Sequence, residues 1–268
     1  MIRLLAPLLG LMVALACSPA IAQPAPAPTL ELLVPAYFYP SRRDTHWPRL
    51  IAAARQVPVT AILNPASGPG SRADSNYLKV TAELRAAGGR VLGYVHTSYG
   101  ERALSDVVAD VDRYAAMYPI DGIFIDEMAN DDDTAHYLYY QAIHGYIKAL
   151  NPQWRVIGNP GAPTQALYLS MPAADVLNVF EDKRRAYVRS YWQPDWVDAY
   201  PASRFAHLVV SAAQASAMRD AVSRAVSRRA GWVYVTDDGG GNPWNRLPSY
   251  WAEEIACVEA INAGQACR

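Results

Sequence analysis

The sequence predicts an α/β fold, a single (β/α)8 barrel. Apolar runs suited to buried strands alternate along the chain with amphipathic helical patterns. Such alternation is typical of a parallel sheet that helices cover. The apolar runs number eight, and eight repeats in roughly 240 residues match the size of one barrel. We expect strands at residues 31–39, 57–63, 90–96, 122–127, 155–158, 176–181, 205–211 and 231–236.

The helices are predicted from their periodicity and from start and stop signals. The clearest patterns cover residues 76–87, 105–118, 134–150 and 215–229, and a last helix follows Pro248. Gly88-Gly89 ends the first of these patterns, and prolines follow the next two. Ser105 and Asp133 are suitable N-terminal residues for the second and third patterns. No boundary between domains is visible, so we expect one domain over residues 30–268.

A doubly wound open sheet is the alternative fold. Its dinucleotide-binding form carries Gly-x-Gly-x-x-Gly after the first strand, and this chain lacks that motif there. Gly68-Pro69-Gly70 follows the second strand, but its proline makes it a rigid loop instead of a phosphate cradle. The barrel is therefore the preferred prediction.

Composition excludes several classes of protein. Of 268 residues, 51% are hydrophobic and 18% charged, with a formal net charge of −1. This excludes a disordered chain and gives no basic stripe for nucleic acid, so we expect no nucleic-acid partner. The chain has 17 Tyr and 7 Trp but only 4 Phe. Tyr and Trp join an apolar face to a polar edge, which suits a carbohydrate cleft, although many of these rings must also line the core.

The N-terminus has the pattern of a cleavable export signal. Arg3 precedes an apolar run that ends at Cys17, and Ala20-Ile21-Ala22 forms a cleavage site, which predicts a signal peptide over residues 1–22. Residues 23–29 form a Pro/Ala-rich leader. Cys17 leaves lipidation open as an alternative, but the residues before it do not match a lipobox well. We expect a secreted or periplasmic monomer with no membrane span after cleavage. Cys257 and Cys267 are then the remaining cysteines, and we expect them to form a local disulfide.

The most informative motif is the fourth strand, whose apolar residues run directly into Asp126 and Glu127. Successive side chains of a strand point to opposite faces, so the two acids do not share one environment while the strand lasts. The sixth strand likewise ends in Glu181, and the eighth is followed by Asp237. In a barrel, these strand ends converge on one cleft.

Other polar and aromatic residues follow the remaining strands. We predict that the subsite residues are Tyr37, Tyr39, Asn64, Tyr94, His96, Asn159, Asp237 and Trp244. Carboxylates from two strands, held across a cleft among aromatic rings, are what glycosidic bond hydrolysis requires. One carboxylate attacks or stabilises the anomeric centre, and a protonated carboxyl donates to the leaving oxygen. Mutual repulsion raises one pKa and leaves the other acid ionised.

Cation binding and serine-nucleophile chemistry are the alternatives to this interpretation. Asp126, Glu127 and the acids at 131–133 could bind a hard cation such as calcium, but the run at 131–133 is more simply the charged start of a helix. The histidines show no zinc-binding spacing, and no Gly-x-Ser-x-Gly is present for a serine nucleophile. We therefore expect neither a metal nor another cofactor.

The chain resembles the spherulation-specific family 4 (spherulin-4-like) proteins, a group that includes glycoside hydrolase family 135. The resemblance is collinear over nearly the whole chain after the leader. Its segments are LVPAYFYP at 33–40, ILNPASGPG at 62–70, GYVHT at 93–97, GIFIDE at 122–127, NPG at 159–161, VFE at 179–181, YVTDD at 234–238 and NPW at 242–244.

The resemblance implies a (β/α)8 barrel that cleaves α-1,4-linked N-acetylgalactosamine stretches of exopolysaccharide. It also implies that the acid pair after the fourth strand and the glutamate after the sixth are critical, and these correspond to Asp126, Glu127 and Glu181. We assign Asp126 as nucleophile, Glu181 as general acid/base, and Glu127 to tuning the pKa or binding the substrate amide. The alternatives are a non-catalytic carbohydrate-binding or cell-surface barrel and a hydrolase of a different α-glycan.

Overall fold

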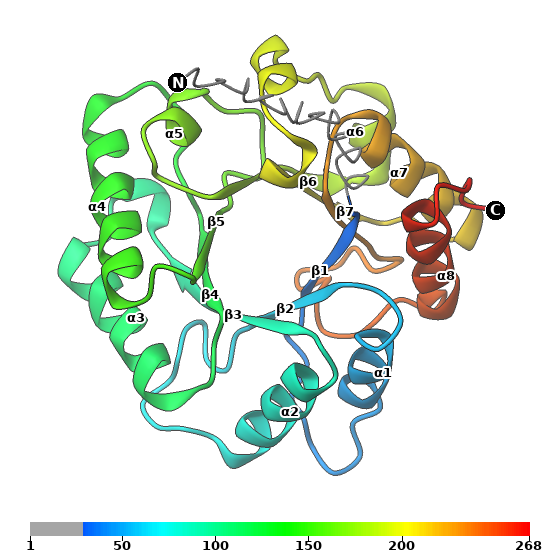
Figure 1. Cartoon of the computed structure of the whole chain (residues 1–268), viewed down its shortest axis with the longest axis horizontal. Coiled ribbons are helices and arrows are strands. Elements are labelled where there is room, and N and C mark those ends of the chain that lie inside the picture. The colour runs from blue at the N-terminus through cyan, green and yellow to red at the C-terminus, as the bar shows by residue number, and fades with distance from the viewer. Residues whose placement is uncertain (1–28) are drawn as a thin grey trace, which may run out of the picture.

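Eight parallel strands form a closed barrel, with each strand hydrogen-bonded to its neighbours in chain order. The computed structural model describes residues 29–268. Figure 1 shows the strands as a central ring with the helices outside it. The strands are β1 Glu31–Pro35, β2 Val59–Leu63, β3 Arg90–His96, β4 Gly122–Asp126, β5 Arg155–Gly158, β6 Val176–Lys183, β7 Phe205–Val210 and β8 Trp232–Val235. The predicted (β/α)8 barrel is therefore confirmed. The predicted signal peptide, the leader up to residue 28 and Cys17 lie outside the described residues.

The C-terminal ends of two strands differ from the prediction by more than one residue. β1 ends at Pro35, although the apolar pattern continues to Tyr39, because Ala36 N–H makes the last bond to β2, at Ile62 O. β6 extends to Lys183, beyond Glu181, because it keeps pairing with β7 after a register shift between Asn178 and Phe180. The extension holds Glu181 within a strand.

The α-helices surround the barrel and confirm the periodic patterns. They are α1 His46–Ala53, α2 Ser75–Ala86, α3 Leu104–Met117, α4 Thr134–Leu150, α5 Leu167–Ser170, α6 Arg184–Arg189, α7 Ala215–Ser227 and α8 Trp251–Asn262. Asp133 begins α4 as predicted, since its side chain accepts from Ala135 N–H. The short helices α5 and α6 are not among the predicted helices, and neither is α1. Pro48 obscures its pattern, but a proline in the first turn of a helix removes no intrahelical hydrogen bond.

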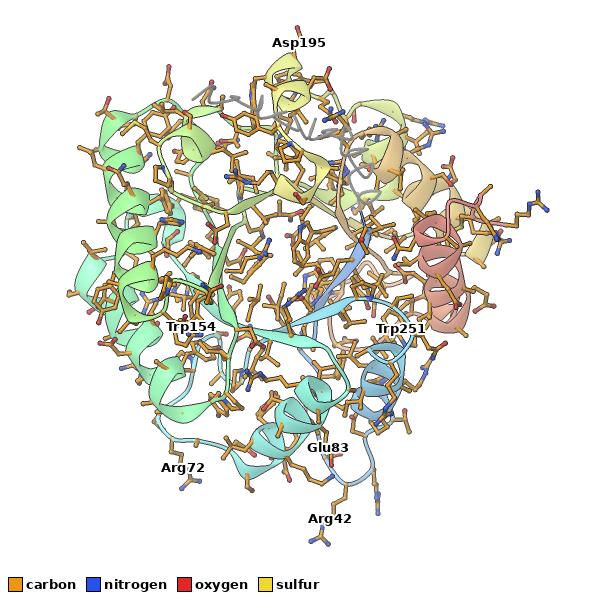
Figure 2. The ribbon with its side chains drawn as sticks, in the orientation of Figure 1. Arg42, Arg72, Glu83, Trp154, Asp195 and Trp251 are labelled. Carbon is orange, nitrogen blue, oxygen red and sulfur yellow. A yellow bond between two sulfur atoms is a disulfide. The ribbon has the colours of Figure 1, made fainter. Side chains whose placement is uncertain are left out.

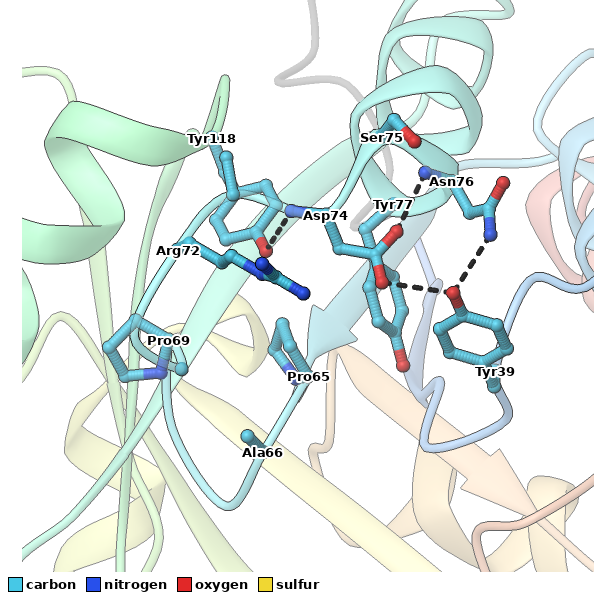
Figure 3. Close-up of a pocket in the computed structure, with 12 residues that line it drawn as sticks. Tyr39, Pro65, Ala66, Pro69, Arg72, Asp74, Ser75, Asn76, Tyr77 and Tyr118 are labelled. Carbon is cyan, nitrogen blue, oxygen red and sulfur yellow. Dashed lines mark hydrogen bonds between the residues drawn. The ribbon is translucent and has the colours of Figure 1, made fainter.

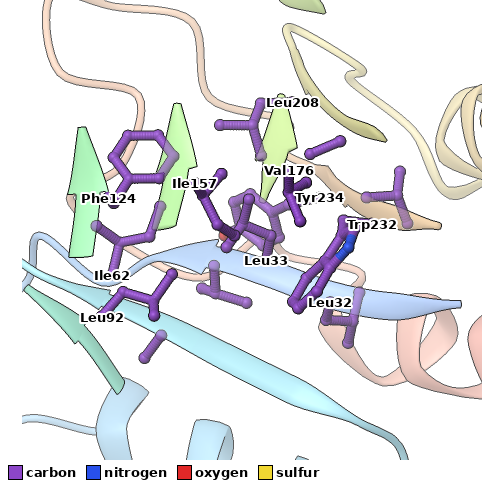
Figure 4. Close-up of a cluster of buried hydrophobic side chains, with 14 of the residues drawn as sticks. Leu32, Leu33, Ile62, Leu92, Phe124, Ile157, Val176, Leu208, Trp232 and Tyr234 are labelled. Carbon is purple, nitrogen blue, oxygen red and sulfur yellow. The ribbon is translucent and has the colours of Figure 1, made fainter. Parts of the chain in front are cut away.

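Apolar side chains fill the barrel and the layer between strands and helices. Figure 4 shows Leu33, Ile62, Phe124 and Leu208 meeting inside the ring, and all four are buried. In Figure 2, charged side chains such as Arg42 point outward, away from the strands. The interior is thus a packed core, which fixes the strand ends relative to one another.

The C-terminal tail is attached to the last helix by a disulfide. Cys257 of α8 is bonded to Cys267, and their Cα atoms lie 4.6 Å apart. This confirms the predicted pairing. No helix among residues 29–268 is long and apolar enough to cross a membrane.

Candidate active site

The acid pair lies where β4 leaves the sheet. Asp126 is its last residue and pairs in register with His96 of β3. Glu127 follows with φ +49°, a left-handed conformation that typically costs a non-glycine residue about 1–3 kcal/mol. Thr97 Oγ1 and Tyr99 N–H both donate to Glu127 O, at 2.8 and 2.7 Å, and hold this conformation.

Residues after the pair are fixed as well. Met128 N–H donates to Asn159 O at 3.0 Å, and Asn159 N–H donates to Ile125 O at 2.8 Å. The Met128 side chain occupies the space that a Cβ at Gly158 would need. The end of β4 is therefore attached to the end of β5, and the two acids lie on a fixed turn.

Asn159 joins the two principal acids. Its Nδ2 donates to Asp126 Oδ1 at 2.6 Å and to Glu181 Oε2 at 2.7 Å. These two oxygens are therefore at most 5.3 Å apart, the sum of the two distances. The side-chain amide of Asn178, fully buried in β6, contacts the Asn159 side chain at 2.7 Å. Acids from β4 and β6 thus meet across a single amide group from β5.

The surroundings of Glu181 favour its protonated form. Burial, followed by the charge of Asp126, raises the pKa of Glu181 from 4.5 to about 7, and the hydrogen bond from Asn159 opposes this rise. At neutral pH a substantial fraction of Glu181 is therefore protonated. A protonated carboxyl beside a carboxylate is the combination that general acid catalysis requires.

Two tyrosines form a wall beside the acids. The rings of Tyr37 and Tyr94 meet edge to face, with centroids 5.7 Å apart. Burial first, and then the charge of Asp126, raises the pKa of both hydroxyls. Both remain neutral hydrogen-bonding groups over the physiological pH range. His96 is partly exposed, and its ring stacks on Tyr94 with centroids 6.5 Å apart.

Asn64 and Tyr39 form hydrogen bonds with residues other than the predicted catalytic acids. Asn64 Oδ1 accepts from Gly68 N–H at 2.8 Å and shapes the loop after β2. Tyr39 OH donates to Asp74 Oδ2 at 2.9 Å and accepts from Asn76 Nδ2 at 2.8 Å, at the start of α2. Tyr39 lines a separate hollow of about 560 Å³, which Figure 3 shows. Pro65 and Tyr118 are among the other residues that line it.

Asp237 and Trp244 shape the loop after β8. Arg246 Nη1 donates to Asp237 Oδ1 at 2.7 Å, and Ser249 N–H donates to Asp237 Oδ2 at 3.2 Å. Burial would raise the pKa of Asp237, but the bonds from Ser249 and Arg246 outweigh it, so the pKa is lowered. Trp244 is 8% exposed and packs on Tyr234, while its carbonyl accepts from Tyr37 N–H at 3.2 Å. Trp244 therefore supports the backbone of Tyr37, and Asp237 is held by partners within the segment after β8.

The acidic side chains at residues 131–133 contact residues close to them in the sequence. Asp131 Oδ1 lies 2.9 Å from His136 Nδ1, and Asp133 begins α4. Within residues 29–268, no three His, Cys, Asp or Glu side chains are grouped so that they could hold a metal ion. The contacts of Asp131 and Asp133 match the interpretation of residues 131–133 as the start of a helix.

Asn178, whose amide contacts Asn159, is a residue of the site that is not predicted from the sequence. The signal was available, since Asn178 is the polar residue inside the apolar run 176–180. A buried polar side chain needs a partner, and here that partner is the residue between the two acids.

Comparison with known proteins gives the family of the chain. The sequence model of the spherulation-specific family 4 matches residues 31–258. Spherulin-4 of Physarum polycephalum is 37% identical over 246 residues, which cover 87% of this chain and 71% of that protein. The chain belongs to the spherulation-specific family 4.

Solved structures extend the comparison. Sph3 of Aspergillus clavatus, determined in complex with GalNAc, has a TM-score of 0.74 and 27% identity, over 87% of this chain and 98% of that one. An α-L-fucosidase isoenzyme 2 from Paenibacillus thiaminolyticus has a TM-score of 0.56 and 14% identity, over 89% of this chain and 50% of that one. The second likeness shows the fold alone. This spherulation-specific family 4 protein therefore shares nearly the whole barrel of Sph3.

Proposed function

We propose that the protein is an exported glycoside hydrolase that cleaves polysaccharide rich in α-1,4-linked N-acetylgalactosamine or galactosamine within the chain. The observation that carries the proposal is the Asn159 amide, which binds Asp126 and Glu181 at once. The substrate class is supported by the likeness to Sph3, whose structure was determined with GalNAc. The disulfide and the predicted signal peptide support export.

The separation of the acids favours a double displacement. Retaining glycosidases hold their carboxyl groups about 5–5.5 Å apart, and inverting enzymes about 6.5–9.5 Å apart. The facing oxygens of Asp126 and Glu181 are at most 5.3 Å apart. This separation lies in the range of retaining enzymes and below that of inverting enzymes, so direct attack by Asp126 is the better-supported mechanism.

In this mechanism, Glu181 donates its proton to the glycosidic oxygen while Asp126 attacks the anomeric carbon. The bond to the leaving sugar breaks, and a covalent bond forms between the sugar and Asp126. Glu181, now ionised, takes a proton from water, whose oxygen then displaces Asp126. Asn159 positions both acids throughout. Glu127, on its fixed turn, tunes the electrostatics or binds the amide of the substrate.

The test is reducing-end release from α-1,4-linked N-acetylgalactosamine oligomers by the purified protein. Asp126→Asn and Glu181→Gln should each lower kcat at least 100-fold with the fold intact. Asp132→Asn is the matched control, since it removes an exposed carboxylate from the loop after β4 and should leave activity unchanged. Glycan binding without release, unaffected by Glu181→Gln, would favour a binding protein. Release from another α-glycan alone would change the substrate but keep the mechanism.

A further inference from the structure

A second hollow has Glu181 among the residues that line it. It has a volume of about 280 Å³ and lies between the loop after β5, the end of β6 and the segment after α6. Its wall includes Gly161, Ala162, Glu181, Asp182, Tyr191 and Trp192. Asp126 does not line this hollow. The hollow is therefore lined in part by the residue proposed as the acid and not by the residue proposed as the nucleophile.

Trp192 is unusually exposed for its size. Its side chain is 65% exposed, a larger fraction than for any other large apolar residue among residues 29–268. Exposing an indole to water forgoes the free energy of burying its large apolar area. A ring left open in a hollow beside an acid is suited to stacking on the C–H face of a sugar.

The wall beside Trp192 is rigid. Tyr191 meets Phe180 edge to face at 5.1 Å, and its hydroxyl lies 3.3 Å from His207 Nε2. The guanidinium of Arg228 lies 4.9 Å from the centre of the Tyr191 ring. The exposed side chains of Asp182 and Ser190 offer an acceptor and a hydroxyl at the same hollow. The hollow thus combines one open ring, a fixed wall and polar groups suited to sugar hydroxyls.

Resting on the proposed function, we infer that Trp192 is the stacking platform for the first sugar on the leaving-group side of the cleaved bond. The acid donates to the oxygen that joins the two sugars at the cleaved bond, and the nucleophile attacks the other sugar. A hollow that contacts Glu181 and not Asp126 therefore holds the leaving sugar. Trp192 is a specificity residue that binds this sugar and takes no part in proton transfer.

The inference is tested with two substrates that differ only in the leaving group. One is an α-1,4-linked N-acetylgalactosamine oligomer, and the other is the α-fluoride of the part of that oligomer on the nucleophile side of the cleaved bond, whose leaving group is a single ion. Trp192→Ala should lower kcat/KM for the oligomer about tenfold, equivalent to about 1.4 kcal/mol, and leave kcat/KM for the fluoride unchanged. Trp192→Phe should recover part of the loss. Leu138→Ala removes another exposed apolar side chain, 55% exposed on α4, and should alter neither rate.

Equal oligomer rates for Trp192→Ala and the wild type would overturn the inference and leave the proposed function standing. An equal loss on both substrates would also overturn it, since Trp192 would then act on the fold or on the other sugar. A wild type inactive on both substrates would overturn the proposed function and this inference with it.

Discussion

Replacing Glu181 by glutamine should stabilise the protein, and the gain should depend on pH. The folded state raises the pKa of Glu181 from 4.5 to about 7, chiefly by burial and then by the charge of Asp126. Ionising this group therefore costs more in the folded protein than in the unfolded chain. Its favourable contribution is fully present below pH 4.5 and is lost as the pH rises through about 7. Glutamine is never ionised, so the variant avoids the loss while still accepting from Asn159.

The size of the gain follows from the same pKa values. A rise from 4.5 to about 7 corresponds to about 3 kcal/mol at 1.36 kcal/mol per pKa unit. Glu181 is partly exposed as a residue, so solvent screening reduces this limit, and we expect about 1–3 kcal/mol. The expected gain is near zero at pH 4 and reaches this range at pH 8.

Urea unfolding of the wild type and of Glu181→Gln at pH 4, 6 and 8 measures the difference in free energy of unfolding. Comparing the two proteins at each pH cancels the titration that they share. Asp132→Asn is the control, and its difference from the wild type should be flat across this range. A Glu181→Gln variant that is no more stable than the wild type at pH 8 would refute the assigned electrostatics of the site.

Three more predictions concern the site and the tail. The wild-type kcat/KM should fall as the pH rises through about 7, because Glu181 loses the proton it donates, and a pH–rate profile flat from pH 6 to 9 would contradict this. Asn159→Ala should lower kcat about 10–100-fold and move this fall in kcat/KM to higher pH, because the hydrogen bond from Asn159 holds the pKa of Glu181 down. A fall that moves to lower pH would contradict the hydrogen bond between Asn159 and Glu181. Replacing Cys257 and Cys267 by serine should lower stability by about 2–3 kcal/mol in a thermal or urea titration without changing kcat, and an unchanged midpoint would show that the tail contributes nothing.

The barrel could be predicted because strand identity is local. Each of the eight strands carries its own run of buried apolar residues, and a helix or loop pattern separates it from the next. The order of strands in a barrel then places β5 between β4 and β6, which is why Asp126, Asn159 and Glu181 could be expected at one end of the barrel. Their shared hydrogen bonds could not be predicted, since those depend on side-chain orientation within a fraction of an ångström.

The other subsite predictions depended on where the chain leaves each strand. Tyr39 shares an apolar pattern with Tyr37, yet β1 ends at Pro35, and the following turn carries Tyr39 to Asp74 and Asn76. The structure places Asp237 against Arg246, and this pairing follows from the path of the loop after β8, which has no periodic pattern. Trp192 lies in a segment without such a pattern as well. Rim residues of a barrel are therefore the least predictable part of its site.

The proposed mechanism is tested most directly by the configuration of the first product released from an α-1,4-linked N-acetylgalactosamine oligomer. Proton NMR during the first minutes of hydrolysis distinguishes the two anomers before they interconvert. A double displacement through Asp126, with Glu181 as acid and base, predicts release of the α-anomer. Initial release of the β-anomer would contradict the assignment of Asp126 as nucleophile.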